Sequence, residues 1–439
     1  MKNRQITIAD SRLSSSLSSS LSSRLNHLIN YCPNYHVLGV VSRYAICMVA
    51  LAMSWAVGLE MDSYAQEQRS TQQQQGTQEP PASVASVIPN EGHARLDWIE
   101  AGDSGSGRID TVEDWQKRRA SIRRNLEKVM GQLPSRESLP PLRVSVLEQV
   151  ELEDGLVRQH IEIDVSTVGV QGELASEWIR AYLFLPKESR KEPQPAMLCL
   201  HQTVTIGKQE PAGLGGSENL HYALELAKRG YVAIAPDYPS FGEYAFDFGS
   251  QPQWASGSMK AIWNNMRCVD LLQQLPQVNG QRIGCIGHSL GGHNTIFTSF
   301  FDERISVAVS SCGFTRFHKY YRGNLKGWTS DRYMPRIARD YQNDPDRVPF
   351  DFPELIAGIA PRAFFTSSPI RDDNFDVEGV RETIGESKRI YRMVGAEDRL
   401  RAMYPDSAHD FPISARQEAY AFIDSILRPA TLSTANPQR

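Results

Sequence analysis

A serine set between glycines is the first feature of this sequence that can do chemistry: residues 287–292 read Gly-His-Ser-Leu-Gly-Gly. The segment follows a short apolar run, 283–286, and precedes a stretch, 293–301, that can form a helix. Glycines two residues before and after the serine let a strand and a helix approach without a Cβ clash, so the turn between them projects the serine hydroxyl. We therefore take Ser289 as a candidate nucleophile, against the alternative of an ordinary glycine-rich turn.

A serine becomes a good nucleophile only when a base takes its proton and a carboxylate orients that base. His409 lies in the loop 405–412, after the apolar run 400–404, and is the one histidine of the sequence that follows both Ser289 and the candidate acids. The first carboxylate after the apolar run 363–366 is Asp372, which is the preferred acid. The alternatives for the acid are Asp373, Asp376 and Asp406.

The negative charge that forms on an attacked carbonyl oxygen needs two backbone N–H donors. One is expected from Leu290, directly after the serine, and the other from the loop that follows the run 196–200. In that loop the amide of Thr203 is preferred and that of Gln202 comes second. His201 has a second interpretation, as a strand-end histidine that packs beneath the site. The candidates for contact with the substrate are His201, Gln202, His288, Tyr238 and Trp328.

The apolar runs that carry these residues are short and continuous, and they alternate with helical stretches. Strands that are buried on both faces have this pattern, which predicts a parallel sheet with crossover helices. They are expected at 196–200, 232–236, 283–286, 305–309, 363–366 and 400–404. Earlier segments alternate with a period of two and predict antiparallel strands at 143–152, 158–165 and 178–186.

Two helices have clear end signals. Thr111 and Asp114 resemble a capping box ahead of an amphipathic helix that runs toward Pro134. The stretch 217–229 reads as a second helix, with cations in its last turn and Gly230 as its left-handed cap. The predicted class is therefore α/β, with a mostly parallel twisted sheet, helices on both of its faces and antiparallel strands at its N-terminal end.

Two insertions are expected to shape a pocket, at 237–248 and at 313–353. The second, a small cap insertion, holds nine aromatic residues among 41, together with Arg316, Arg322, Arg332 and Arg336. Aromatic and guanidinium groups can stack on a sugar or hold an acidic group. The alternative is that the aromatics form the core of a packed helical cap. They are Phe314, Phe317, Tyr320, Tyr321, Trp328, Tyr333, Tyr341, Phe350 and Phe352.

Composition excludes several classes of protein. The 439 residues are 41% apolar, and 47 Lys and Arg against 51 Asp and Glu give a net charge of −4, so no basic field predicts nucleic-acid binding. The six cysteines show no CxxC or Cys/His spacing, so we expect neither a zinc site nor a disulfide scaffold, and no metal or organic cofactor. The sequence leaves the oligomeric state open. Four cysteines are expected as small buried hydrophobes, with disulfide pairing second: Cys199, Cys268, Cys285 and Cys312.

The N-terminal region has the pattern of a signal peptide over residues 1–65: a basic segment, an apolar stretch at 44–59 and small residues at Ser63 and Ala65. Export to the periplasm or the medium is expected, with no stable membrane insertion after cleavage. The alternatives are an uncleaved anchor or a start site further in. Residues 66–84 are rich in Gln and Pro and predict a disordered linker, followed by a folded domain at 85–430 and a tail at 431–439.

Together, the 287–292 motif, the strand and loop at His201, the segment 235–239, Asp372 and the His409 loop resemble the α/β-hydrolase superfamily. Over roughly residues 110 to 428 the chain is similar to exported proteins of the dienelactone-hydrolase-like and acetyl-xylan-esterase-like branch. The resemblance implies an α/β-hydrolase fold, with Ser289 as nucleophile, His409 as general base and acid, and Asp372 as the orienting carboxylate.

The chain departs from these families at three positions. Dienelactone hydrolases have a cysteine where this chain has Ser289, and the acetyl xylan esterases have a glutamine at the position of Leu290. Glucuronoyl esterases fit less well, since they have a cysteine at the position of His288. The resemblance therefore implies the esterase chemistry more strongly than it implies the substrate.

The sequence predicts a secreted serine carboxylic-ester hydrolase that forms an acyl-enzyme on small, acetyl-like esters, with a small molecule or a polysaccharide as the ester-bearing partner. A serine peptidase of the prolyl-oligopeptidase type is the main alternative, although the folded segment before residue 196 is too short for a propeller. The second alternative is a non-catalytic binding protein on the same scaffold.

Overall fold

The computed structural model describes Leu96, Trp98–Ile99 and residues 107–428, except 138, 154, 170–171, 189–191 and 252. The described residues all belong to one compact unit, Ile88–Arg439. The predicted signal peptide, linker and C-terminal tail lie outside the described residues. Among the helices that are described, none is both long and apolar enough to cross a membrane.

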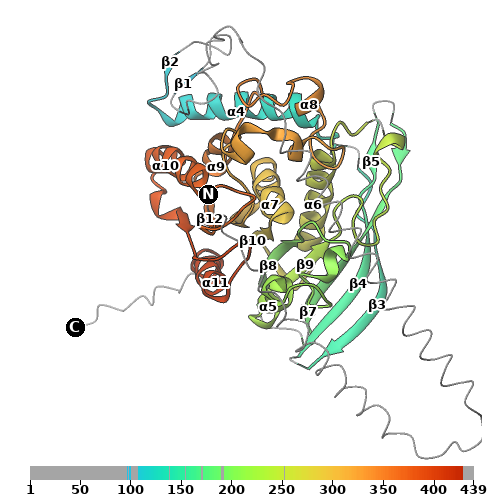
Figure 1. Cartoon of the computed structure of the whole chain (residues 1–439). Helices are drawn as coiled ribbons and strands as arrows, with labels where there is room; N and C mark the ends of the chain where they lie inside the picture. The colour runs from blue at the N-terminus through green and yellow to red at the C-terminus, as the bar shows by residue number, and fades with distance from the viewer. Residues whose placement is uncertain are drawn as a thin grey trace, which may run out of the picture. The chain divides into compact units, whose positions relative to one another are not determined.

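A nine-stranded sheet forms the centre of the described unit, in the order β13-β12-β11-β10-β8-β9-β7-β4-β3 (Figure 1). The six strands β13, β12, β11, β10, β8 and β9 are parallel to one another, whereas β7, β4 and β3 are joined to β9 and to one another by antiparallel pairing. The predicted class is confirmed. The bounds are β3 Val144–Leu152, β4 Leu156–Asp164, β7 Trp178–Pro186, β8 Gln194–Leu200, β9 Val232–Pro236, β10 Val278–His288, β11 Ile305–Ser311, β12 Ala363–Ser367 and β13 Leu400–Met403.

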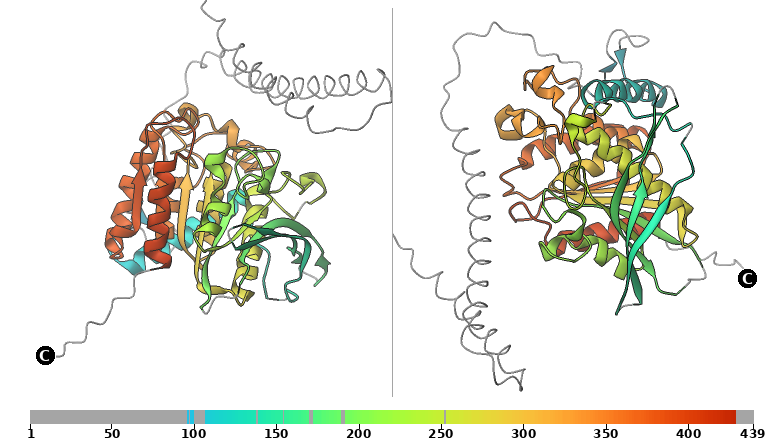
Figure 2. Two further views of the ribbon diagram at one scale, coloured as in Figure 1. Left: turned by 90° about the horizontal axis from the view of Figure 1, so that it is seen from below. Right: turned by 90° about the vertical axis from the view of Figure 1, so that its right-hand side faces the viewer.

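Helices cover both faces of the sheet, as predicted. One apolar cluster packs α4, α6, α7, α9 and α10 against the sheet, and a second packs α5 and α11 against the other face. Figure 2 shows the sheet between these two layers. The bounds are α4 Val112–Met130, α5 Tyr222–Lys228, α6 Gly257–Gln274, α7 Leu290–Phe301, α8 Arg336–Arg339, α9 Phe352–Ile359, α10 Val377–Met393 and α11 Ile413–Leu427. Two small pairs complete the described strands: β1 Trp98–Ile99 with β2 Gly107–Arg108, and β5 Thr167–Val168 with β6 Leu174–Ala175.

The two predicted helices differ from expectation at their ends. The hydroxyl of Thr111 accepts the N–H of Asp114, as the cap requires, but α4 ends at Gly131 with φ 95°, before Pro134. The stretch 217–229 is not one helix: a 3-10 turn, Glu218–Leu220, precedes α5. The carbonyl of Pro211 takes the N–H groups of residues 223 and 224 that a continuous helix would use. Gly230, with φ 88°, supplies the predicted cap.

The cap insertion is not the packed helical element that one interpretation predicted. Besides the short helix α8 it contains 3-10 turns at Tyr320–Gly323 and Leu325–Trp328, and α9 begins at its end. Its aromatic residues are nevertheless mainly core: six of the nine are buried, namely Phe314, Phe317, Tyr320, Trp328, Phe350 and Phe352.

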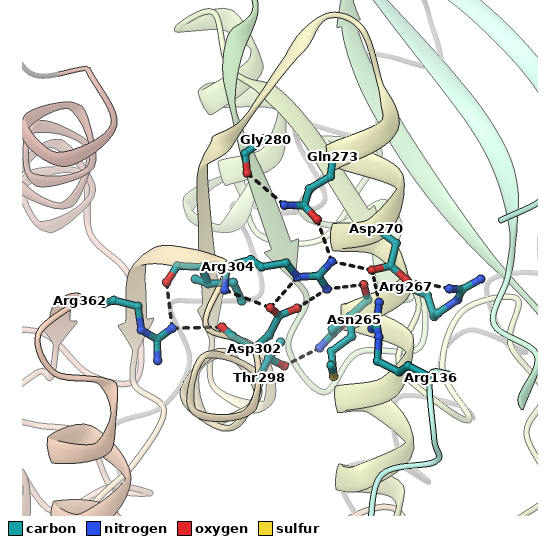
Figure 3. A network of polar contacts seen from close by, with 12 residues as sticks. Arg136, Asn265, Arg267, Asp270, Gln273, Gly280, Thr298, Asp302, Arg304 and Arg362 are labelled. Atoms are coloured by element: carbon teal, nitrogen blue, oxygen red, sulfur yellow. Dashed lines mark hydrogen bonds and ion pairs between the residues drawn. The ribbon is translucent and has the colours of Figure 1, made fainter. Parts of the chain in front are cut away.

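A polar network ties the helices together at the amino ends of β11 and β12 (Figure 3). Arg304 donates to Asp302 at 2.6 Å, to Asp270 at 2.6 Å and to Gln273 at 2.9 Å. Arg362 donates to the carbonyls of Ser299 and Asp302. Because Ser289 follows the carboxyl end of the neighbouring parallel strand, this network lies at the opposite edge of the sheet and supports the fold.

Candidate active site

The candidate nucleophile lies on a tight turn between β10 and α7. Ser289 has φ 53° and ψ −116°, a conformation that a side-chain-bearing residue adopts only under strain, and its N–H donates to the Ser311 carbonyl at 2.8 Å. A Cβ on Gly287 would come within 2.2 Å of the Gly291 carbonyl oxygen, and a Cβ on Gly291 within 1.9 Å of the Leu200 carbonyl oxygen. Glycine is therefore required at both positions, as the motif predicts.

The acid and base candidates meet at the carboxyl edge of the sheet. Asp372 follows β12 and His409 follows β13, and Nδ1 of His409 lies 3.0 Å from Oδ1 and 2.9 Å from Oδ2 of Asp372. The Asp372 side chain is 1% exposed, and that of His409 is 23% exposed. Oδ1 of Asp372 also accepts the N–H groups of Asn374, at 2.9 Å, and Phe375, at 3.1 Å. These bonds fix the carboxylate and point it at the imidazole.

The other candidate carboxylates have different surroundings. Asp373 is exposed and has no hydrogen-bonding partner for its carboxylate among the described residues. Asp376 caps α10 by accepting the N–H of Glu378 at 2.8 Å. Asp406 pairs with Arg371 at 2.8 Å, with both side chains largely exposed. Of the four, Asp372 is the carboxylate that contacts His409.

A buried cysteine next to this pair was missed as part of the site. Cys312 follows β11 with φ 47°, and its Sγ, Asp372 and His409 lie within 4.8 Å of one another. Its thiol donates to the Asp410 carbonyl at 3.4 Å. Burial raises the pKa of this thiol well above its usual value, and the charge of Asp372 raises it further, so the thiol stays protonated. The prediction that the four cysteines are buried is confirmed, and all four are free.

These three side chains are of metal-ligating types, and in the described residues they form the group that comes nearest to a metal centre. Asp372 and His409 already form a hydrogen bond with each other. The group is therefore interpreted as an acid and a base with a neutral thiol next to them. The sequence signal for Cys312 was its position at the end of an apolar run. That run forms β11, which ends at the same edge of the sheet as the strand before Ser289.

The loop after β8 is held from below by His201. Its Nε2 accepts the N–H of Tyr238 at 2.9 Å, so Nδ1 carries the proton and donates to the Gln202 carbonyl at 2.5 Å. Burial lowers the pKa of His201, which keeps it in this neutral form. The Tyr238 hydroxyl donates to the Arg332 carbonyl at 2.5 Å. Both side chains are buried, so the second interpretation of His201 fits and Tyr238 links the two insertions.

The two candidate oxyanion donors have free amides. Thr203 is exposed, and its hydroxyl lies 3.3 Å from that of Tyr333. Within the described part of the chain, the N–H groups of Thr203 and Leu290 donate to no acceptor. The N–H of Gln202, the second candidate, likewise donates to no acceptor in the described residues, while its side chain donates to Glu210 at 3.0 Å.

Two further histidines lie in the wall of the site, both buried. Nδ1 of His288 lies 3.0 Å from the Ser311 hydroxyl, and its ring packs edge-on to that of His409 at 4.9 Å. Burial, and then the neighbouring His409, lower the pKa of His288 well below its usual value. His293, which the sequence analysis passed over, packs against Trp328 at 4.8 Å, and burial lowers its pKa to about 3.

Trp328 is 2% exposed, with its ring against Phe375 at 6.2 Å as well as against His293. It therefore lies in the buried wall of the site. Like His201, Tyr238 and His288, it is buried in the described structure and supports the site from within. These four side chains are not exposed to a substrate.

Comparison with known proteins places the chain among esterases. Residues 246–395 match the family described as glucuronyl esterase, fungi. The putative hydrolase YtaP of Bacillus subtilis is 27% identical over 70% of this chain and 100% of its own length. A putative carboxymethylenebutenolidase of Saccharomyces cerevisiae is 31% identical over 29% of this chain and 48% of its own length.

Solved structures show the same fold. A glucuronoyl esterase from Solibacter usitatus has a TM-score of 0.58 and 17% identity, covering 78% of this chain and 99% of its own. A putative acetyl xylan esterase from Bacteroides fragilis has a TM-score of 0.51 and 19% identity, covering 71% of this chain and 83% of its own.

The chain has the α/β-hydrolase fold. It is similar to the dienelactone-hydrolase-like and acetyl-xylan-esterase-like proteins, as the sequence resemblance implied, and to the glucuronyl esterases. His288 predicted a poorer fit to the glucuronoyl esterases, and this expectation is corrected. The segment that matches their family, 246–395, extends far beyond His288 and includes the whole cap insertion.

Proposed function

We propose that this chain is a serine carboxylic-ester hydrolase that cleaves esters of carbohydrates through Ser289, His409 and Asp372. The observation that carries the proposal is the bond between the buried Asp372 carboxylate and Nδ1 of His409, at the sheet edge where Ser289 occupies a strained turn. An imidazole held in this way has its Nε2 free to accept the serine proton.

The reaction follows from these roles. Ser289 Oγ attacks the carbonyl carbon and its proton passes to Nε2 of His409, while the N–H groups of Leu290 and Thr203 stabilise the oxyanion. His409 then gives the proton to the departing alcohol, which leaves an acyl-enzyme. Water, deprotonated by His409, attacks this ester, and the carboxylic acid leaves as Ser289 recovers its proton. Asp372 stabilises the imidazolium in both halves.

The first substrate class is a small acyl ester on a polysaccharide. The solved structure of a putative acetyl xylan esterase with the same fold supports this class. The experiment is hydrolysis of p-nitrophenyl esters from acetyl upward, followed by acetate release from acetylated xylan. Turnover of acetyl esters with a steep loss for longer chains is expected. Failure to release acetate from either substrate would overturn the acetyl-ester form of the proposal.

A second candidate places the carbohydrate on the acid side of the ester. The match of residues 246–395 to the glucuronyl esterases favours an ester of a uronic acid carboxyl group. Release of methanol from methyl glucuronate, compared with release of acetate from acetylated xylan at equal enzyme concentration, separates the two candidates. Preference for the methyl ester would transfer the proposal to sugar-acid esters, with the same three residues in the same roles.

We also propose export of the protein, with residues 1–65 as signal peptide, 66–84 as linker, 85–430 as catalytic domain and 431–439 as tail. The basic and apolar segments of the sequence support it. N-terminal sequencing of the mature protein is expected to begin at Gln66. A full-length protein retained in the cytoplasm would overturn this part of the proposal.

A further inference from the structure

A cleft of about 350 Å³ opens directly beside the acid of the candidate site. Its lining includes Tyr321 and Arg322 of the cap insertion and Ile370, Asp372 and Asp373 of the loop after β12. This volume is within the range of small-ligand sites. Since Asp372 itself forms part of the wall, whatever fills the cleft is a neighbour of the acid and base pair.

The aromatic residue in this cleft differs from the buried aromatics of the cap insertion. Tyr321 is 46% exposed. Its ring packs edge-on against that of Tyr320 at 4.8 Å, Tyr320 packs against Phe375 at 5.8 Å, and Phe375 lies 6.0 Å from the ring of His409. Tyr321 is therefore the open end of a row of rings that begins at His409.

The backbone holds this ring outward at a cost. Tyr321 has φ 41° and Arg322 has φ 59°, so two consecutive residues with side chains adopt the left-handed conformation. In this conformation the Cβ crowds the backbone, a steric cost that glycine would avoid. Strained residues of this kind concentrate at sites that bind ligands. The turn presents Tyr321 and Arg322 side by side in the cleft.

The arginines of the cap insertion separate in the same way as its aromatics. Arg316 pairs with Asp351 and Glu386. Arg332 and Arg336 donate to the Ser240 hydroxyl and the Lys128 carbonyl. Arg339 pairs with Asp340, and Arg347 pairs with Asp344. Of the six arginines, Arg322 alone has no side-chain partner among the residues that the structure describes.

Most of the charged groups that line the cleft already have partners. Lys319, also in the wall, pairs with Glu382, and Asp376 is occupied at the N-terminus of α10. Asp373 has no hydrogen-bond or ion-pair partner in the described residues, and burial, followed by the charge of Asp373, raises the pKa of the Tyr321 hydroxyl. One uncommitted cation, Arg322, and one uncommitted anion, Asp373, therefore remain. They favour a neutral ligand with many hydroxyl groups over an ion of either sign.

We propose that this cleft is a subsite for a neutral pyranose unit of the carbohydrate that bears the scissile ester, an inference that rests on the proposed function. One face of the sugar ring packs on Tyr321. Its hydroxyls donate to the Asp373 carboxylate and accept from the Arg322 guanidinium. The subsite gives the alternative acid of the sequence analysis a different role, in binding the sugar and outside the proton transfer.

The kinetic test compares two substrates in each variant, p-nitrophenyl acetate and an acetylated xylo-oligosaccharide. Tyr321→Ala is expected to lower the ratio of kcat/KM for the sugar ester to that for the small ester by about tenfold, mainly through KM, whereas Tyr321→Phe keeps the ratio within about threefold. Asp373→Asn is expected to lower it about threefold to tenfold. Asp398→Asn, an exposed aspartate at the opposite end of β13, is the matched control and leaves the ratio unchanged. Equal losses on both substrates would overturn the subsite.

A binding test separates failure of the subsite from failure of the proposed function. The Ser289→Ala protein is titrated with a deacetylated xylo-oligosaccharide by calorimetry, with and without Tyr321→Ala. Binding that Tyr321→Ala weakens about tenfold supports the subsite, even if the parent hydrolyses no ester. An inactive parent would overturn the proposed function alone. An active parent whose Ser289→Ala form binds no oligosaccharide, or binds it equally with Tyr321→Ala, would overturn the subsite alone.

Discussion

Replacement of Asp372 by asparagine tests the acid and base pair with no change in side-chain size. Oδ1 of Asp372 accepts the N–H groups of Asn374 and Phe375, and Oδ2 lies 2.9 Å from Nδ1 of His409. An amide has one oxygen, and only an oxygen can accept those two N–H groups. The asparagine oxygen therefore takes the Oδ1 position, 3.0 Å from Nδ1, and the NH₂ group takes the Oδ2 position, which is the nearer of the two to Nδ1.

This orientation reverses the tautomer of His409. The amide NH₂ donates to Nδ1, so the proton of the imidazole moves to Nε2, which can then no longer accept the proton of Ser289. The opposite amide orientation would leave two backbone N–H groups facing an NH₂ group. Each N–H group would then lack an acceptor, which costs about 1–3 kcal/mol of free energy. We expect Asp372→Asn to lower kcat about 10⁴-fold, equivalent to about 5.5 kcal/mol in the activation barrier.

The assay is initial-rate hydrolysis of p-nitrophenyl acetate, with the thermal midpoint measured on the same preparation. Asp406→Asn is the control, because Asp406 follows β13 in the same region but pairs with Arg371 at the surface. Its rate is expected within about twofold of the parent, since exposed pairs contribute little. An Asp372→Asn enzyme within tenfold of the parent would refute the assignment of Asp372 as the orienting acid.

Three other predictions follow from buried groups. Lys208→Met leaves the Asp237 carboxylate, 0% exposed and 2.7 Å from the lysine Nζ, without its partner, and is expected to lower the free energy of unfolding by about 3–5 kcal/mol in a denaturant titration; a loss below 1 kcal/mol would contradict this. Gly291→Ala places a Cβ 1.9 Å from the Leu200 carbonyl oxygen and is expected to abolish turnover or folding, whereas Gly385→Ala, which meets nothing within 4 Å, leaves both intact; an active Gly291→Ala would be the contrary result. Burial keeps the pKa of His293 at about 3, below its usual 6.5, so the unfolded chain binds the extra proton and stability falls as the pH drops from 6.5 toward 3; His293→Phe is expected to make the unfolding free energy less acid-sensitive in that window, and an unchanged pH dependence would argue against it.

The strands and the motif were predictable because each depends on local sequence. Continuous apolar runs identified β8 to β13 within a few residues, and the glycines at 287 and 291 identified the turn, since no other residue fits there. The order of Asp372 and His409 after successive strands was enough to bring them together, because parallel strands end at the same edge.

Contacts between distant loops were not predictable in the same way. His201 and Tyr238 are 37 positions apart and meet through one hydrogen bond, which turns two candidate ligand contacts into a support for the loop. The nine aromatics of the cap insertion look alike in sequence, and only packing separates the buried ones from the exposed Tyr321. Cys312 reads as one more apolar strand residue, although it lies beside the acid.

The measurement that tests the central claim most directly is covalent trapping of the nucleophile. The parent and Ser289→Ala proteins are incubated with a fluorophosphonate and with p-nitrophenyl acetate, and the labelled peptide is identified by mass spectrometry. The account predicts one adduct on Ser289, ester hydrolysis by the parent, and neither label nor turnover in the folded variant. A Ser289→Ala protein that hydrolyses the ester as fast as the parent, or an adduct on another residue, would contradict it.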